Sequence, residues 1–540
     1  MPAAEIIERM KTFESNRTNW DTQYQQCAEY GMPQNSQITD RHASGATKKD
    51  LFDTTAEESN IQLAAGLYSY MFPTDGRAFV LEIEEDDLKE DDEVTQWLSK
   101  TTTLIHRHLV NSNFRDAFYE FLKSLGCFGT AVLYEEKGKK KPIVFINHFM
   151  GGVYIARNSD GEVDTIYRKL EFTARQAVQE FGKENVGDKI LKSYENPKHR
   201  DRKFNFIHAL FPREEYDIEK DDSVNMPVAS VYVCRDDKSI VSESGYPEMP
   251  EQSAYFDKDS LEDYGRSPMM KKLPDIKMVN AMQKCRIKGW EKQVDPPILL
   301  PDDGSIWPLA TQPGGVIHYR AGGDKPEWFE FKGNLTEMEK AIETVQQSIQ
   351  RGFFLDMFDP LVDRQNMTAT EVMARVEQKM RFLTPIIGRL QSGLFNPMIH
   401  RIIGILGRQG LLPMMPEQLV NRDYNVMYLG RLALAMKTLE TEGLAKTVAE
   451  WAPLTQAQIV TGWEDNLDVD TAFRDSARNN GMPATWLKDM ERMAEEREAR
   501  AQAEQAQMMI QAAPELAKAA KAGGTKPEEG SLTEGIMNAA

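Results

Sequence analysis

Two helical patterns bracket a short insertion rich in proline and glycine, and this arrangement restricts the fold more than any other feature of the chain. The first helix is expected from about Pro274 to Val294, because proline is favoured in a first helical turn and Pro296 and Pro297 would end the helix. The insertion, residues 295–333, holds six prolines and six glycines with short strand-like pieces, which is typical of a compact β-containing segment.

A second helix returns from the insertion. Asn334 precedes Glu337 by three positions, which is a signal for a capped helix start. Apolar residues then recur at spacings of four, three and four, as expected for one helix face: Met338, Ile342, Val345 and Ile349. Two helices around a compact insertion predict an antenna that projects from the rest of the protein.

An aromatic and acidic loop, GFFLDMFDPLVDRQ, follows the returning helix and leads into the motif NMTATEV. Thr368 and Glu371 have the spacing of a capping box, in which each side chain bonds an unpaired backbone amide of the first turn. Met367 and Val372 stand at the two positions of a hydrophobic staple. Each device is worth about 1 kcal/mol, so we expect a fixed joint between the loop and the helix.

A long apolar stripe begins at this joint. Hydrophobic residues recur at spacings of three or four from Val372 to Leu394, and a helix continued to residue 410 would be roughly 60 Å long. Pro385 predicts a kink near Arg381 to Pro385, since proline removes one helical hydrogen bond. A second bend or break is expected at Pro397.

The first 266 residues mix helices and strands, so the predicted fold class is α+β, mainly helical. Helices are expected at 1–30, at 94–111, at 114–125 and after the stretch DTTAEESN, where Thr54 with Glu57 and Thr55 with Glu58 have capping-box spacing. This last helix should stop near Pro73. Short β-rich runs follow at 130–136, 142–148, 151–158, 163–172, 204–211 and 228–235, with a helix at 174–181 and a loop from 242 to about 266.

The last third of the chain is expected to be mostly helical. From Trp486 the pattern loses its large hydrophobic residues and becomes rich in Ala, Glu, Arg and Gln. A helix of this composition buries little by itself and would pack beside copies of itself. The final twenty residues are expected to be disordered.

Composition excludes several classes of protein. With 540 residues, 41% of them hydrophobic and 28% charged, the chain is predicted to be globular, and no run approaches the roughly 18 apolar residues of a membrane span. The amphipathic, charged N-terminus is unlike a signal peptide, so the protein is expected to stay in the compartment where it is made. The net charge of −19 argues against tight sequence-independent binding of nucleic acid.

No recognised catalytic or metal-binding motif occurs. A phosphate-binding GxxxxGK[ST] loop, HExxH, GxSxG and CxxC are all absent. His106 and His108 would point to different sides of a helix, and the four cysteines are expected to be free and buried. Nine of the twelve residues 82–93 are acidic, which predicts a solvated loop or helix start, with a metal site as the alternative. Asp87 and Lys89 form a DxK fragment of the kind found in some nucleases.

The order of these parts resembles the portal (head-to-tail connector) proteins of short-tailed bacteriophages. The resemblance is carried by GRSP before the first antenna helix, DPP after it, the insertion, the returning helix, the aromatic loop and the MTATEV motif followed by Arg375. The stretches DTTAEESNIQLAAGLYSYMFP and GCFGTAVLYEE also resemble the N-terminal region of that family. The resemblance covers most of the chain, and the chain length agrees with it.

The resemblance implies a portal fold with wing, stem, clip and crown, assembled as a ring around a central channel. The implied regions are the wing at 1–266, stem helices at 267–294 and 334–352, the clip at 295–333, the tunnel loop at 353–366, a long kinked wing helix at 367–410, a helical wing or crown region at 411–485, a crown or barrel helix at 486–520 and a disordered tail at 521–540.

The function implied is that of a ring, usually of twelve subunits, at one capsid vertex, through which double-stranded DNA passes during packaging and ejection. The implied partners are the packaging motor (terminase), tail adaptor proteins, major capsid and scaffolding proteins, and internal core or ejection proteins at the crown. The location implied is the virion, after synthesis in the host cytoplasm. No cofactor, metal or catalytic residue is implied. The alternatives are a tail adaptor or another structural ring, and a metal-dependent DNA-processing enzyme.

Two groups of residues are candidates for contact with passing DNA. On the stem, the basic residues Lys277, Lys284 and Lys288 face either the channel and neighbouring subunits or acidic residues of the adjacent stem helix. The loop residues either line a constriction and set its charge or, in the case of the aromatic ones, pack under the wing: Phe353, Phe354, Asp356, Met357, Phe358, Asp359, Asp363 and Arg364. The joint at Met367, Thr368, Glu371 and Val372 would transmit movement of the loop to the wing.

Overall fold

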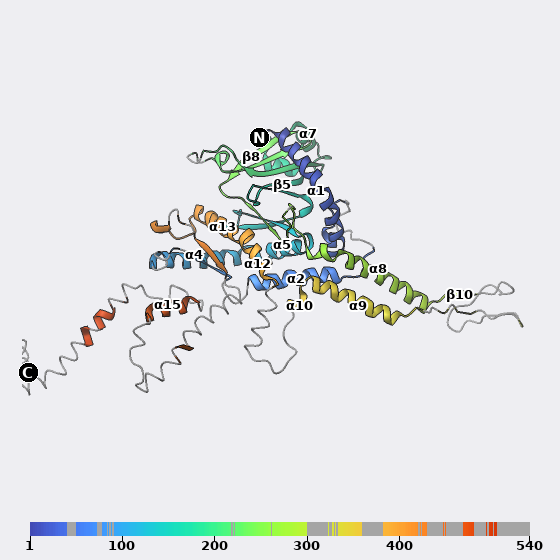
Figure 1. The fold of residues 1–540 in the computed structure, drawn as a ribbon. Helices are drawn as coiled ribbons and strands as arrows, with labels where there is room; N and C mark the ends of the chain where they lie inside the picture. The colour runs from blue at the N-terminus through green and yellow to red at the C-terminus, as the bar shows by residue number, and fades with distance from the viewer. Residues whose placement is uncertain are drawn as a thin grey trace, which may run out of the picture. The chain divides into compact units, whose positions relative to one another are not determined.

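The computed structural model divides the chain into two compact units. One consists of Met1–Ala78 and Leu104–Leu412, and the other of Phe79–Thr103 and Pro413–Ala540. The structure describes residues 1–39, 50–72, 78–83, 85, 88, 91–217, 220, 222–260, 262–299, 322, 327–328, 330, 333–358, 382–419, 422, 424–428, 446–447, 449, 468–479, 493, 496–500 and 502–504. Figure 1 shows the elements of both units in chain order.

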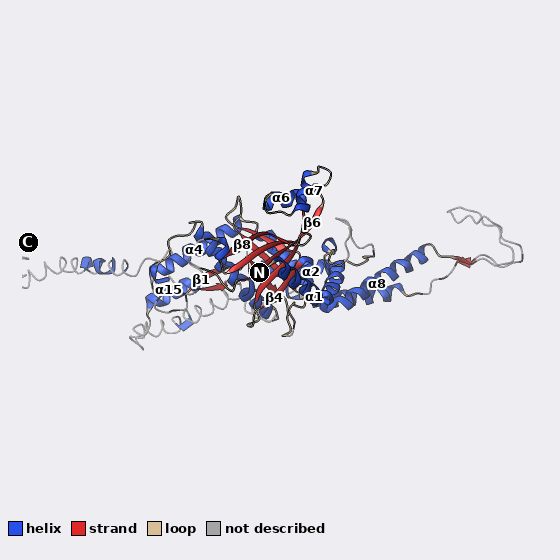
Figure 2. Ribbon diagram, turned by 90° about the horizontal axis from the view of Figure 1, so that it is seen from above, coloured by secondary structure: helices blue, strands red, loops and turns tan. Residues whose placement is uncertain are grey.

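A five-stranded antiparallel sheet lies in the first unit (Figure 2), with its strands in sequence order. They are β4 (Val153–Arg157), β5 (Val163–Thr173), β6 (Lys203–Pro212), β7 (Val228–Cys234) and β8 (Ser239–Tyr246). Successive side chains of a strand point to opposite faces, and apolar residues of β6 occupy both faces, among them Phe206 and Ile207. Both faces of this sheet are therefore available for packing.

Helices cover the two faces of the five-stranded sheet. Ile207 and Ala209 of β6 belong to a buried cluster with Ile6 and Met10 of α1 (Ala3–Gly31). The alternate residue Phe206 belongs to a second cluster, with α6 (Ala174–Phe181) and α7 (Asp188–Glu195). The alternation of β6 thus fixes α1 on one face and the α6–α7 pair on the other.

A three-stranded antiparallel sheet, in the order β3 (Val144–His148), β2 (Thr130–Glu136) and β9 (Glu251–Tyr255), forms the second layer of the first unit. The adjoining helices are α2 (Thr55–Met71) and α5 (Phe114–Phe128). Phenylalanine rings join them: Phe72, at the end of α2, meets Phe114 and Phe118 of α5 with ring centroids 4.9 Å and 5.5 Å apart. Aromatic pairs of this kind add about 0.5–1.5 kcal/mol each to the gain from burial, so they strengthen the packing of α2 against α5.

The expected interruption before Pro397 is present. Helix α12 (Thr384–Leu390) passes into a π-helical segment, η4 (Gln391–Phe395), before α13 (Asn396–Arg408) begins with Pro397 in its first turn. The ring of a proline displaces the carbonyl four residues earlier, and a π-turn accommodates that change within a continuous helix. Pro385 lies in the first turn of α12. The residues of the predicted kink before 382 lie outside the described part of the chain.

The antenna helices are present as α8 (Pro268–Val294) and α9 (Leu335–Gly352), which run side by side away from the sheets (Figures 1 and 2). The predicted start at Pro274 was wrong. Ser267 caps the helix by accepting a hydrogen bond from the Met270 backbone N at 3.0 Å, and Pro268 takes the first-turn position expected of Pro274. The capping of α9 is confirmed, since the Asn334 side chain accepts from the Glu337 backbone N at 3.2 Å.

The second unit contains a two-stranded antiparallel sheet of β1 (Phe79–Glu82) and β12 (Asn425–Tyr428). The Trp97 indole donates to the Pro413 backbone O at 3.1 Å, which joins the two segments of this unit. Helix α4 (Asp92–Asn111) begins here, and the Asp91 carboxylate accepts from the Glu93 and Val94 backbone N atoms at its start. The helix start expected in the acidic run is therefore confirmed. Helix α15 (Val469–Asn479) also belongs to this unit.

Among the described residues, the helices predicted at 1–30, 94–111, 114–125 and 174–181 and the strands predicted between 130 and 235 are present, with errors at a few points. The predicted loop from 242 to 266 was wrong, because β8 extends to Tyr246 and β9 follows; their polar residues gave no strand pattern. Helix α7 was not predicted. The Thr54 capping box was also wrong: Asp53, one residue earlier, accepts from the Thr55 backbone N at 3.0 Å, and Thr54 instead bonds the Glu58 side chain. None of the helices in the described residues is long and apolar enough to cross a membrane.

Candidate functional site

The base of the antenna contacts the body of the first unit at several places, one of which is the short segment 50–53. The Phe52 backbone N donates to Asn280 Oδ1 of α8 at 2.7 Å, and Asn280 Nδ2 donates to the Asp50 backbone O at 2.9 Å. A single side-chain amide thus satisfies a donor and an acceptor of an extended backbone. Because Asn280 is buried, breaking this pair would leave polar atoms without partners, so the segment is held firmly on α8.

Asp53 joins the two antenna helices to each other. Its Oδ2 accepts from Gln283 Nε2 of α8 at 3.2 Å and from Gln346 Nε2 of α9 at 2.7 Å, and its Oδ1 caps α2. The residue is 9% exposed. A buried carboxylate with three donors from three helices fixes the relative register of those helices, because each bond depends on the position of the other two.

A second polar contact lies nearer the end of α9. Lys272 Nζ of α8 donates to Ser348 Oγ of α9 at 2.9 Å and to Asp275 Oδ2 at 3.0 Å, and Ser348 in turn donates to Asp275 at 3.2 Å. Close approach of the helices also depends on Gly352, where a Cβ atom would come within 2.5 Å of the Lys272 side chain. The two helices therefore form one rigid pair at their base.

The segment after α9 begins inside the core. Phe353 is fully buried, and Phe354, at a φ of 59°, lies with its ring centroid 6.1 Å from that of Phe256. The short helix α10 (Leu355–Phe358) follows, with Asp356 exposed and Met357 half-buried. The Phe358 ring lies against Gly66 of α2, so closely that a Cβ there would be 2.6 Å away. These aromatic side chains pack against the body of the first unit. Asp359, Asp363 and Arg364 lie outside the described residues.

The basic residues of α8 have different surroundings. Lys277 Nζ donates to Gln26 Oε1 of α1 at 2.8 Å, and Lys284 pairs with Asp50 at 3.6 Å over the ring of Phe52. Lys288, further along the helix, is exposed. The structure therefore brings Lys277 and Lys284 to the attachment of the antenna. The joint residues Met367, Thr368, Glu371 and Val372, most of the insertion and most of the region from 486 onward lie outside the described residues.

A buried ionic cluster between the two sheets of the first unit was not predicted. Arg168 of β5 pairs with Glu251 of β9 at 2.9 Å, and its guanidinium also lies 2.6 Å from ring nitrogens of His148 and His208. Burial, and then the nearby Arg168 charge, hold the pKa of His208 well below its usual value, so this histidine stays neutral. The available signal was a polar residue, His208, within the apolar run FIHALF.

A second cluster fixes α13 to the C-terminal end of β2. Arg401 is 1% exposed; its Nη2 donates to Glu136 Oε2 at 2.7 Å and its Nη1 donates to the Glu248 backbone O at 2.7 Å. Burial raises the pKa of the neighbouring Glu135 carboxyl well above its usual value, although Arg401 opposes the shift. Both clusters connect structural layers, which indicates a structural role.

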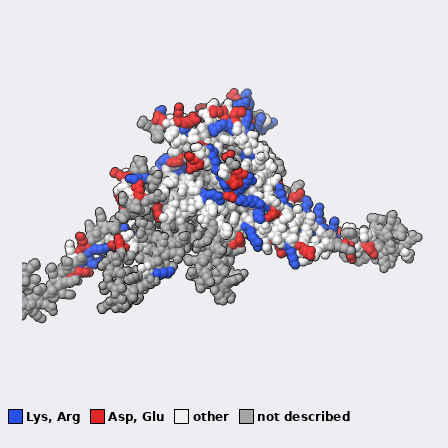
Figure 3. Space-filling model, in the orientation of Figure 1, with Lys and Arg blue, Asp and Glu red and all other residues white. Residues whose placement is uncertain are grey.

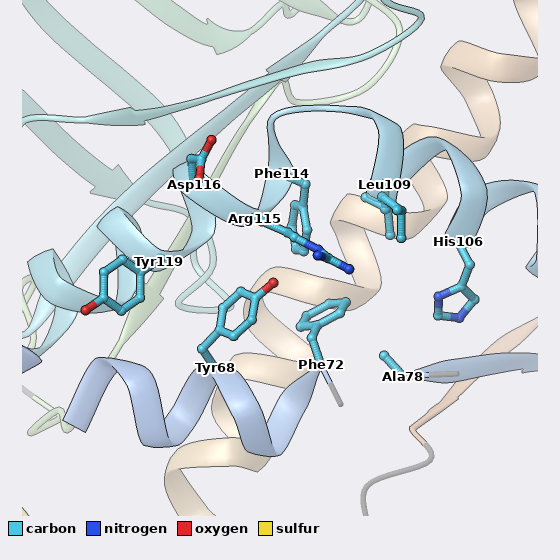
Figure 4. Close-up of a pocket in the computed structure, with 10 residues that line it drawn as sticks. Tyr68, Phe72, Ala78, His106, Leu109, Phe114, Arg115, Asp116 and Tyr119 are labelled. Atoms are coloured by element: carbon cyan, nitrogen blue, oxygen red, sulfur yellow. The ribbon is translucent and has the colours of Figure 1, made fainter. Parts of the chain in front are cut away.

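Figure 4 shows a pocket of 360 Å³ between α2, α4 and α5, with Tyr68, Phe72, Phe114 and Tyr119 on its walls. Arg115, Asp116 and His106 supply its polar groups. Its described walls contain no serine or cysteine beside a base, so the elements of nucleophilic catalysis are missing from them. Among the described residues no three His, Cys, Asp or Glu side chains are grouped so as to hold a metal ion, and Asp87 and Lys89 lie outside them.

The four cysteines are free, but one expectation about them was wrong. Cys27, Cys127 and Cys234 are buried, whereas Cys285 is exposed on α8. Its position is uncovered because α8 extends beyond the body of the unit there. Burial raises the pKa of the Cys27 thiol to about 12, which makes it unreactive at neutral pH.

Comparison with known proteins identifies the family. The family model for the bacteriophage head to tail connecting protein matches residues 3–487. The chain belongs to the portal (head-to-tail connecting) protein family of bacteriophages. The portal protein of Salmonella phage epsilon15 is 26% identical over 549 residues, covering 99% of this chain and 98% of that protein. The probable portal protein of Bordetella phage BPP-1 is 27% identical over 457 residues, covering 82% and 81%.

Membership of the portal family confirms the resemblance and excludes one of the two alternative functions. Portal proteins are structural and not enzymes, which excludes the metal-dependent DNA-processing enzyme. The match runs through the antenna helices, the loop after α9 and the helices that follow. The base of the antenna, where Asn280 and Asp53 join α8 and α9 to the body, is therefore a structural site within the region that matches the portal family.

Proposed function

We propose that the chain is the subunit of a ring of twelve copies, placed at one capsid vertex, with a central channel for double-stranded DNA during packaging and ejection. The family supports this function, since portal membership implies a homo-oligomer with capsid and tail partners. In this proposal α8 and α9 form the stem, residues 295–333 the clip, 1–266 the wing and 486–520 the crown.

The observation that carries the ring is the surface of α8 beyond its attachment. Ile287 and Trp290 are 37% and 40% exposed in the single chain, and Val294 is 87% exposed. A helix face with so many exposed large apolar residues is typical of a protein interface. Neighbouring subunits would cover this face when stems lie side by side, and Lys288 would then face a neighbour or the channel.

In the ring, the loop after α9 would reach the channel. The buried Phe353 and the half-buried Phe354 and Phe358 would hold the start of this segment against the wing, with the exposed Asp356 turned away from it. Asp359, Asp363 and Arg364 would set the charge of the constriction. The capped joint at Met367, Thr368, Glu371 and Val372 would connect the loop to the long wing helix. Lys277 and Lys284 would support the stem base.

The proposed partners follow from this position. Terminase and the tail adaptor proteins would meet the clip in turn, while major capsid and scaffolding proteins would surround the wing. Internal core or ejection proteins would contact the crown. The location of the assembled ring would be the virion, after synthesis of the subunits in the host cytoplasm.

Negative-stain electron microscopy of the purified protein tests the proposal. We expect rings with a central hole, and we expect Trp290→Asp to lower the assembled fraction because it places a charge in the stem interface. Val224→Asp is the matched control, since Val224 is similarly exposed, at 45%, but lies far from the stem in the sequence. Images without rings would contradict the ring, and equal assembly of the two variants would contradict the stem interface.

A further inference from the structure

A basic turn lies on the α6–α7 side of the five-stranded sheet, outside the proposed channel. The turn that follows α7, residues 196–203, has the sequence NPKHRDRK, with four Lys or Arg residues against one aspartate, and all eight residues are exposed. Figure 3 shows Lys and Arg side chains gathered over α7, and Figure 2 shows α6 and α7 standing out from the sheet. This local excess of positive charge contrasts with the −19 of the whole chain.

Backbone hydrogen bonds bring a further arginine into the same surface. The Ala174 N donates to the Arg202 O at 3.0 Å, and the Arg175 N donates to the Arg200 O at 3.1 Å. These two bonds place the start of α6 directly beside the turn. Arg175, Arg200 and Arg202 therefore lie together, and we refer to these three residues as the arginine surface.

Two of these arginines are held by aromatic rings. The Arg200 guanidinium lies 5.3 Å from the centroid of Tyr194, where its Nε also donates to the Tyr194 backbone O at 2.9 Å, and Arg202 lies 5.6 Å from the centroid of Phe204. Stacking restricts the side chain and leaves N–H groups at the edge of the guanidinium for another acceptor. Within the described residues no carboxylate forms an ion pair with any of the three arginines.

The chemistry of the surface distinguishes between two kinds of polyanion. A protein partner would need apolar or aromatic anchors at the centre of its interface, yet none of the exposed large hydrophobic residues in the described chain falls between residues 150 and 215. Contact with a nucleic-acid backbone needs only cations at the surface, and arginine binds phosphate oxygens in pairs. A surface with charge but no apolar anchors fits phosphates.

We propose that the arginine surface binds the phosphate backbone of double-stranded DNA without regard to sequence. The site goes beyond the proposed function because it does not require a channel or a ring: each subunit carries it. It would give the wing a weak, salt-dependent contact with DNA, separate from any contact made by the stem or the loop.

Fluorescence anisotropy with a labelled 25-base-pair duplex, from 50 to 200 mM salt, tests this inference on the intact protein. We expect Arg175→Gln/Arg200→Gln/Arg202→Gln to weaken binding by at least about tenfold at low salt. The slope of log Kd against log salt should fall by about 2 to 3, because each phosphate that the protein no longer neutralises removes about one unit from it. The triple Arg→Lys variant, which keeps the charge, should bind more tightly than the triple Gln variant.

The control is Lys139→Gln/Lys140→Gln/Lys141→Gln, which removes the same charge from another exposed turn of the same unit. It should bind DNA within about twofold of the natural chain. Equal weakening by the two triple variants would overturn the inference, because the effect would then follow net charge alone. Unchanged binding in the arginine variant would overturn it as well, and so would tighter binding of poly-glutamate than of the duplex. Gel filtration should show the same assembly state for all the proteins compared.

Discussion

The carboxylate of Asp53 offers a direct test of how the stem is attached, because one substitution removes a bond to each of three helices. In Asp53→Ala, Gln283 and Gln346 lose their shared acceptor and the Thr55 backbone N loses its cap. Gln283 is only 7% exposed, so water would not replace the missing bond without rearrangement. The substitution should therefore separate α8 from α9 at their base.

The size of the effect follows from these interactions. Hydrogen bonds to a charged group contribute about 1.5–3 kcal/mol each, and removal of a helix cap costs about 1 kcal/mol. Because Gln346 is only half-buried and hydration recovers part of the energy, we expect a decrease of about 3–5 kcal/mol in the free energy of unfolding. Asp53→Asn should reduce the free energy of unfolding by about half as much. The asparagine side chain keeps one acceptor oxygen, and the Gln283 and Gln346 amides can flip so that their oxygens accept from its NH₂ group.

Asp50→Ala provides the control within the same segment. Asp50 also contacts α8, but its side chain is 68% exposed and lies 3.6 Å from Lys284, which is itself 43% exposed. Pairs so exposed contribute at most about 1 kcal/mol. Urea unfolding followed by tryptophan fluorescence, with all proteins in the same assembly state, measures the difference. If Asp53→Ala and Asp50→Ala were equally stable, the assignment of Asp53 as the bond between the stem helices would be wrong.

Two further predictions concern packing and pH. Gly66→Ala should destabilise the protein by about 1–3 kcal/mol, because the new methyl group meets the Phe358 ring. In a Phe358→Ala background the same substitution should stabilise the protein by up to about 1 kcal/mol, because alanine favours the helix more than glycine does. Thermal unfolding of the natural chain, the two single variants and the double variant tests this change of sign. His208, whose pKa is lowered in the folded state, takes up a proton more readily when unfolded, so stability should fall as the pH drops below about 6.5, by at most about 1.4 kcal/mol per pH unit. The slope should be smaller in His208→Asn than in the natural chain across pH 7 to 5, and equal slopes would refute the assignment of this dependence to His208.

Features encoded by neighbouring residues were predictable from the sequence. The Asn334 cap and the interruption before Pro397 depend on interactions within a few positions, and both are present. Local signals can also compete: Pro268 and Pro274 are both compatible with a first helical turn, and only the Ser267 cap decides between them. The start of α8 was therefore predicted six residues too late, at Pro274 instead of Pro268.

The polar contacts that hold the site together were not predictable. Asn280 and Asp53 meet partners more than two hundred positions away, and nothing near either residue distinguishes it from an exposed polar side chain. The same holds for Arg168 with Glu251, whose pairing depends on how two sheets pack. Strand β8 was missed because its polar residues become a strand only through pairing with β7.

The pairing of Phe79 with Tyr428 sets a condition on the order of events during synthesis. The first strand of this sheet leaves the ribosome roughly 350 residues before the second, which at about 5–20 residues per second is a delay of about 20–70 s. During that interval β1 exposes an unpaired edge in a cell that is making many copies of the same chain. An early strand from one molecule could then pair with a late strand from another, so slow translation would favour entangled subunits, and a chaperone that covers β1 would favour correct ones.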